Sequence, residues 1–337
     1  MGSQITTKST ETNLPPLASG IPPWPSILFV AMMFPIGMSF LPSLEELDGI
    51  SQVSVWTNRK FPNLISLQTM AYIRLSIAAI AIGLMIHLAV GPGWQLFPNY
   101  KPNSKLRRVF LRLQGFGTLV PFTSWSWYLL AYGFLCRGVI ALAAAQMLQP
   151  EPPPEWAIHI LNSPWLLRST LITWELSAPF AMLVSTVTKY VLWPQAIKGG
   201  KPHNLAGFRN QLQHNCNAIW ILLEATLLGG PPVKFLHISM AFATGAVYML
   251  FTWIMGVVYF GNRKIGPQYI YWFMDTTLGK ATTIAIVALT TALSIYFALF
   301  SFVMSTLLGG GGDSEPNLLL NVAVLVLGTH LVCRFKE

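Results

Sequence analysis

Two polar residues within largely apolar stretches have the types that a hydrolytic reaction needs. Thr123 lies in the run 121–127, and His214 begins the run 214–217. A threonine hydroxyl becomes an effective nucleophile when a base takes its proton, and histidine is the most frequent base in enzymes. Asn217 follows His214 by three residues on the same helix face, where it can orient the ring or donate to an oxyanion. We therefore predict Thr123 as nucleophile, His214 as base and Asn217 as the supporting group.

The same residues also fit a purely structural role. Threonine in membrane helices commonly bonds its own backbone or a neighbouring helix, and an intramembrane histidine often satisfies one polar contact. The nearby Trp125, Trp127 and Tyr128 are typical of an aromatic belt at a membrane interface. Both interpretations remain open from the residue types alone.

Further ionisable residues occur inside the apolar runs, where charges are costly and usually face the bundle interior. Glu224 is ten residues after His214, or about 15 Å along a helix axis, so it lies too far away to orient the imidazole. We expect Glu224 and Glu175 toward the luminal side, paired with Arg137 or Arg168.

The elements that position these residues follow from the composition. Of the 337 residues, 53% are hydrophobic and only 10% are charged, whereas soluble domains carry about 25% charged residues. Most of the surface must therefore face lipid. The net charge of +9 lies largely in short loops, where it sets topology and contacts anionic lipid headgroups. These features predict membrane lipid as a partner and exclude nucleic acid.

The apolar runs give the fold class, because a helix needs about 20 apolar residues to cross a bilayer. The clearest runs are 65–90, 116–147, 171–193, 212–228, 233–260 and 281–308. Two shorter runs, 26–41 and 318–333, flank them. The prediction is an all-α, polytopic transmembrane helical bundle with about eight spans, with six or seven as the alternatives.

Loop charge predicts the orientation of these spans. The loops 101–112 and 198–209 are basic, whereas the loop between them carries Glu151 and Glu155. Basic loops face the cytosol. The alternation along the chain predicts that both termini are cytosolic, in the endoplasmic reticulum or the plasma membrane.

The domain organisation is simple. Residues 1–25 are polar and rich in Ser, Thr and Pro, and are expected to form a disordered cytosolic tail; Gly2 fits the myristoylation pattern. Residues 26–333 form a single transmembrane domain, and 334–337 a short cytosolic C-terminus. The scattered Cys136, Cys216 and Cys333 have no metal-ligand spacing, and the sequence implies no metal or organic cofactor.

Several stretches together carry a resemblance to a known superfamily, in their order and in their placement within the predicted spans. They are residues 122–129, 174–193, 214–224 and 232–259. In these stretches the sequence resembles the androgen-induced membrane hydrolases, and more closely the rolling stone family of fly and related proteins. The similarity covers roughly residues 65–308, as judged from the order of the motifs.

The resemblance implies residue roles. The hydrolase branch cleaves lipid esters of hydroxy fatty acids with an intramembrane threonine and histidine, which fall on Thr123 and His214. The ten-residue step from that histidine to an acidic residue ends here at Glu224. Residues 211–213 differ from the hydrolase branch, and the pairing of His214 with Asn217 is similar to the rolling stone branch, whose members are linked to cell fusion.

Two functions are therefore expected. The first is a membrane-embedded threonine hydrolase of lipid fatty-acid esters. The alternative is a non-catalytic membrane protein that serves in adhesion, fusion or scaffolding, and a transporter comes third because the intramembrane charges are few.

Overall fold

The computed structural model describes residues 17–200, 203–307 and 316–334. Most of the predicted tail, with Gly2, lies outside the described residues, as do the last residues of the predicted C-terminus. Residues 17–23 have no regular secondary structure before the first helix begins.

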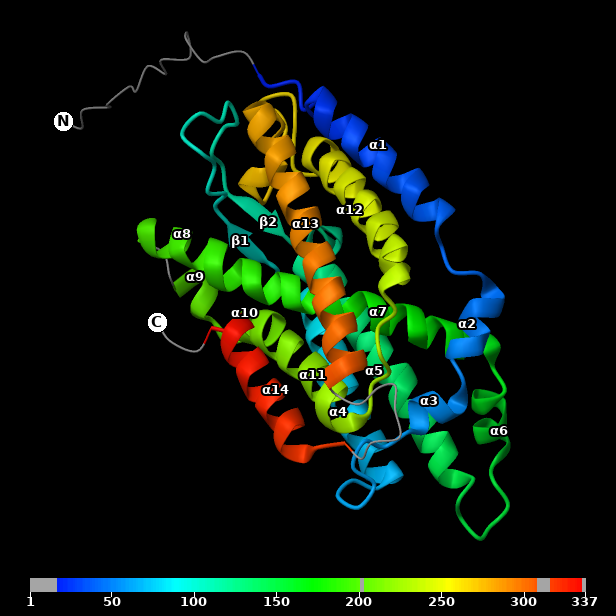
Figure 1. Ribbon diagram of the computed structural model, residues 1–337. Helices are drawn as coiled ribbons and strands as arrows, with labels where there is room; N and C mark the ends of the chain where they lie inside the picture. Colours follow the sequence, from blue (N-terminus) through cyan, green and yellow to red (C-terminus); the bar gives the residue numbers. More distant parts are fainter. Residues whose placement is uncertain (1–16, 201–202, 308–315, 335–337) are drawn as a thin grey trace, which may run out of the picture.

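The described chain is almost entirely helical (Figure 1). The α-helices are α1 (Trp24–Ser39), α2 (Leu44–Ile50), α3 (Val53–Thr57), α4 (Leu67–Val90), α5 (Phe122–Gln146), α6 (Glu155–Leu161), α7 (Pro164–Val187), α8 (Trp193–Lys198), α9 (His203–Ala206), α10 (Phe208–Gln211), α11 (Asn217–Leu223), α12 (Ile238–Val258), α13 (Lys280–Phe302) and α14 (Leu318–Val332). Two short strands, β1 (Trp94–Leu96) and β2 (Leu111–Leu113), pair in antiparallel fashion.

Short turns of other helical types connect or extend these elements. The 3-10 turns are Gly115–Leu119, Phe235–His237, Trp272–Met274 and Thr276–Leu278. The π-helical turns are Thr188–Leu192, Leu212–Cys216, Glu224–Leu228 and Val303–Leu307. Through the π turns, α7 runs on into α8, and α10 runs on through α11 as one helical segment, 208–228.

Side-chain caps fix where several helices begin. Ser66, Ser163 and Asn317 accept hydrogen bonds from backbone N–H groups in the first turns of α4, α7 and α14. These bonds satisfy donors that a helix start otherwise leaves unpaired. Pro164 follows its cap at the first helical position, where its missing N–H costs nothing.

The structure confirms the all-α fold class and a set of membrane-length helices. In the described chain, 5 helical stretches are long and apolar enough to cross a membrane, or up to 6 if α1 and α2, bent by 68°, form one span. These stretches are Leu67–Val90, Phe122–Gln146, Pro164–Lys198, Phe235–Val258 and Lys280–Thr306.

Besides α1, which meets that standard only if joined to α2, two of the predicted spans are helical without meeting it. The segment 208–228 has a polar first half, and α14 has only 15 residues. The predicted number of about eight spans is therefore not confirmed by length and hydropathy, because these two segments are too polar or too short.

The long helices pack as an elongated bundle. α4 packs along α5, α5 along α7, and α1 along α12. The two strands lie near one end of the bundle with the end of α12 and the start of α13, whereas α3 and α6 lie at the other end (Figure 1). Gly37 allows α1 to approach α12 closely, since a Cβ there would lie 2.8 Å from the backbone of Ser239 and Ala243 in α12.

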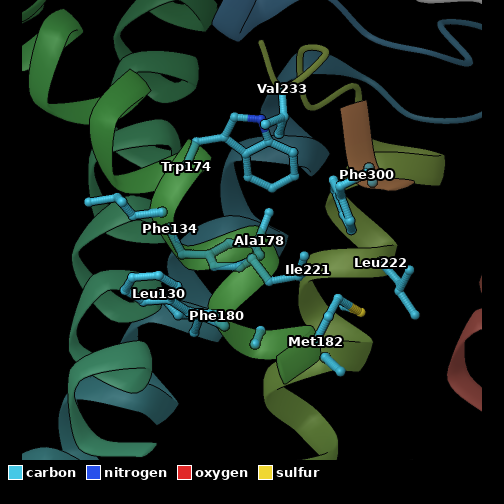
Figure 2. Close-up of a cluster of buried hydrophobic side chains, with 14 of the residues drawn as sticks. Leu130, Phe134, Trp174, Ala178, Phe180, Met182, Ile221, Leu222, Val233 and Phe300 are labelled. Atoms are coloured by element: carbon cyan, nitrogen blue, oxygen red, sulfur yellow. The ribbon is translucent and has the colours of Figure 1, made fainter. Parts of the chain in front are cut away.

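Helix α7 is the centre of the main hydrophobic cluster. In the most apolar stretch of the span that contains α7, 83% of the residues are buried, whereas in the corresponding stretch of the α13 span only 22% are buried. Figure 2 shows its side chains interleaved with those of α5, α11 and α13. The labelled members are Leu130, Phe134, Trp174, Ala178, Phe180, Met182, Ile221, Leu222, Val233 and Phe300. Any residue of α7 that faces this interior is therefore held between several helices.

A buried charge cluster crosses the same interior. Arg74 of α4 donates to both carboxylate oxygens of Glu224, at 2.6 and 3.1 Å, and also to the carbonyls of Trp56 and Leu228. Both charged side chains are fully buried. Arg74 therefore ties α4 to the far end of the segment 208–228.

A second arginine joins this cluster less completely. Arg137 of α5 lies 4.0 Å from Glu224, between the rings of Phe134 and Trp174. None of its guanidinium nitrogens has a hydrogen-bond partner within the described chain. The cluster therefore holds two positive charges against one negative charge.

Two substitutions should separate these roles. Glu224→Gln leaves two buried guanidinium groups without a counter-charge, which should lower the free energy of unfolding by about 3–5 kcal/mol. Arg137→Met removes a charge that lacks hydrogen bonds and keeps an apolar side chain, so stability should stay equal or rise by about 1–4 kcal/mol. Melting temperatures of both variants in detergent measure the difference. An equal loss in both would mean that Arg137 is as well paired as Arg74.

Candidate functional site

A cavity of about 90 Å³ lies between α1, the end of α7, α12 and α13. Most of its wall is apolar, with Met33, Val184 and Leu293 among its members. The hydroxyls of Thr123 and Thr188 belong to residues of the same wall. An apolar cavity with a few polar groups is the usual form of a site for a small or lipid-like ligand.

Thr123 is the second residue of α5, and Pro121 precedes the helix in an extended conformation. Thr123 is 6% exposed and lies close to the hydroxyl of Tyr271, in the loop between α12 and α13. Burial raises the pKa of the Tyr271 hydroxyl to about 12, although the neighbouring Thr123 hydroxyl acts in the opposite direction. Tyr271 therefore keeps its proton at neutral pH and cannot serve as a base for Thr123.

His214 faces a different threonine. Its Nδ1 lies 2.9 Å from the hydroxyl of Thr188, the residue that begins a π turn at the end of α7. The hydroxyl of Ser185 donates to the backbone carbonyl of His214. His214 itself lies in the π turn Leu212–Cys216. Single π turns inside helices occur frequently at functional sites.

Asn217 makes a separate contact, toward α5. Its amide nitrogen donates to the hydroxyl of Ser126 at 2.9 Å, and both side chains are fully buried. Its amide oxygen has no partner within the described chain. The contact ties α11 to α5.

The structure thus brings some of the predicted residues together and separates others. Thr123 lines the cavity, and His214 reaches the cavity wall through Thr188. No hydrogen bond joins Thr123 to His214 in the part of the chain that the structure describes, so the predicted pair remains a prediction. Thr188 was not predicted. Its position near the basic-loop end of the run 171–193, the same end as Thr123 and His214, is the signal that could have identified it.

The other intramembrane charges are paired differently from the prediction. Glu175 accepts from His237 Nδ1 and from the backbone N–H of Lys234, so its predicted pairing with Arg137 or Arg168 is wrong. Arg168 instead donates to both oxygens of Asp48 in α2. For Glu224 the neighbour Arg137 was predicted, and its main partner, Arg74, was not.

Comparisons with family models, with curated proteins and with solved structures found no match for this chain. Among the described residues, no group of three or more His, Cys, Asp or Glu side chains is arranged to hold a metal ion. The class of the site must therefore be inferred from its own geometry.

The contact between Asn217 and Ser126 can be tested by a double-mutant cycle. Asn217→Ala and Ser126→Ala should each lower stability by about 0.5–2 kcal/mol, because each removes an interhelical hydrogen bond. The double variant should lose less than the sum of the two. Melting temperatures of the four proteins in detergent give the coupling energy, and strict additivity would show that the bond contributes nothing.

Proposed function

We propose that this protein is a membrane-embedded hydrolase of lipid fatty-acid esters. The proposal rests on the contact between His214 Nδ1 and the Thr188 hydroxyl at the wall of an apolar cavity. The apolar wall suits an acyl chain, a hydroxyl at the wall is a potential nucleophile, and the imidazole is within reach to take its proton. His214 serves as the general base.

The proposal includes membership of the superfamily that the sequence resembles. We place the chain with the androgen-induced membrane hydrolases and the rolling stone family, for which the resemblance gives Thr123 as nucleophile. Thr123 also borders the cavity, so either threonine is compatible with this class of reaction.

Hydrolysis by the purified protein tests the reaction class. The wild-type protein in detergent should release free acid from a fatty-acid ester of a hydroxy fatty acid, measured by mass spectrometry, and His214→Ala should lower the rate by about 10³-fold or more. His87→Ala is the matched control, because His87 is exposed on α4 and is not among the lining residues of the cavity. Equal rates for wild type and His214→Ala would end the assignment of His214 as base.

The cavity itself can be blocked from α12. A Cβ at Gly245 would meet only the end of Met33, at 3.8 Å, so Gly245→Leu should fold and extend into the cavity. Hydrolysis of a long-chain ester should fall by about tenfold or more, since a misplaced acyl group loses its reacting geometry. Gly83→Leu makes the same change on α4, where nothing lies within 4 Å of the added Cβ, and should leave the rate unchanged. Equal effects of both variants would place the reaction elsewhere.

The proposed arrangement has about eight membrane crossings with both termini in the cytosol. The basic stretches 101–112, 198–200 and 203–209 support it, since they lie at one end of the bundle. The loop 150–154, with Glu151, lies at the other end. The segment 208–228 and α14 would cross as members of the bundle, because their polar or short sequences are covered by neighbouring helices.

Cysteine labelling tests this orientation. In sealed vesicles of known orientation made from the membrane that holds the protein, Glu151→Cys and Lys105→Cys should react with an impermeant maleimide from opposite faces, because basic loops remain cytosolic. The native cysteines, of which Cys136 and Cys333 are buried, give a background measured on the unchanged chain. Labelling of both positions from the same side would contradict the arrangement.

The alternative is a non-catalytic adhesion, fusion or scaffolding protein of the rolling stone type. The bonds from His214 and Asn217 to neighbouring helices support it, because both are interhelical hydrogen bonds. In that case His214→Ala lowers stability by about 0.5–2 kcal/mol, and the wild-type protein hydrolyses no ester.

A further inference from the structure

We infer that Thr188, rather than Thr123, is the nucleophile of the proposed hydrolysis. The inference rests on the proposed function and concerns which cavity hydroxyl forms the acyl-enzyme. Both threonines line the cavity and are almost equally buried, at 7% exposure for Thr188 and 6% for Thr123. Position at the cavity therefore does not distinguish them, and the difference lies in their partners.

The partner of Thr188 is a base. A threonine hydroxyl needs a proton acceptor within about 2.6–3.2 Å to become nucleophilic, and His214 Nδ1 lies 2.9 Å from the Thr188 oxygen. The hydroxyl next to Thr123 is that of Tyr271, whose raised pKa of about 12 keeps it protonated at neutral pH. Thr188 thus contacts a ring nitrogen that can accept its proton, whereas Thr123 lies beside a hydroxyl that is not a base.

The local backbone holds this pair in place. Thr188 begins a π turn, which adds a residue to the helical repeat and changes the direction of the side chains that follow α7. His214 sits in a second π turn, and Ser185, one turn before Thr188, donates to the His214 carbonyl. The imidazole and the hydroxyl are therefore fixed by two adjacent contacts between the same two segments.

The reaction balances with the substrate and water alone. The Thr188 oxygen attacks the ester carbonyl while its proton moves to Nδ1 of His214, a step that requires the tautomer with its proton on Nε2. The bond to the alcohol oxygen breaks, and the departing alcohol takes the proton from Nδ1. A water molecule then attacks the threonyl ester, its proton passes through His214 to the Thr188 oxygen, and the free fatty acid leaves.

Covalent trapping identifies the nucleophile. A fluorophosphonate with a long alkyl chain should label the full-length protein in detergent, and mass spectrometry of its peptides should place the adduct on Thr188. Thr188→Val, which keeps the shape but lacks the hydroxyl, should lose labelling and at least about 10³-fold of the ester hydrolysis rate, whereas Thr188→Ser should keep part of both.

Thr173→Val is the matched control. Thr173 lies on the same helix with the same exposure of 7%, and its hydroxyl bonds the backbone of its own helix. This variant should be labelled and should hydrolyse ester as the wild-type protein does. A melting temperature for each variant separates loss of the hydroxyl from loss of the fold.

The outcomes separate this inference from the proposed function. An adduct on Thr123, or ester hydrolysis by Thr188→Val at the wild-type rate, would overturn the assignment of Thr188. The proposed hydrolase function would still stand. If the wild-type protein forms no adduct and hydrolyses no ester, both the assignment of Thr188 and the proposed hydrolase are overturned. The interhelical bond would then be the whole role of His214.

Discussion

The ion pair between Arg74 and Glu224 is the interaction on which the position of the candidate site depends. The segment 208–228 is too polar in its first half to hold itself among apolar helices. Glu224 anchors one end of this segment to α4 through two hydrogen bonds, with no solvent exposure on either side chain. Because an unpaired charge is costly in this interior, the pair favours one depth for the whole segment.

The remaining polar contacts of the segment follow from that anchor. Asn217 lies seven residues before Glu224, which is about two helical turns, and reaches Ser126 of α5. His214 lies one turn further and reaches Thr188 at the end of α7. The segment is thus held by polar contacts to three neighbouring helices, α4, α5 and α7, and His214 contacts the cavity wall at the end farthest from Glu224.

The sequence was sufficient for the local features of this arrangement. Apolar runs long enough to cross a membrane predict the helical class. The polar residues within these runs predict that Thr123 and His214 lie inside the bundle. The helical span at 212–228 begins four residues earlier, at Phe208, because the polar residues 208–211 continue the same helix. These features depend on neighbours along the chain, which a sequence displays directly.

The pairings could not be obtained in the same way. Arg74 and Glu224 are 150 residues apart, and their contact depends on which helices become neighbours. The partner of His214 depended in addition on a π turn, which shifts side chains by a fraction of a turn without any clear sequence mark. Opposite charge favours an arginine as the partner of Glu175, but His237, which precedes α12, contacts it instead.

The charge cluster also has a consequence for how the chain is made. Both arginines precede their carboxylate in the order of synthesis, and Arg74 is separated from Glu224 by 150 residues. At about 5–20 residues per second, α4 emerges roughly 8–30 s before its counter-ion. During that interval α4 and α5 hold guanidinium groups that lack their carboxylate, and an arginine in a membrane helix costs up to about 2.5–3.5 kcal/mol on insertion. The apolar remainder of each helix has to offset that cost until the segment 208–228 is made and Glu224 can pair with the arginines.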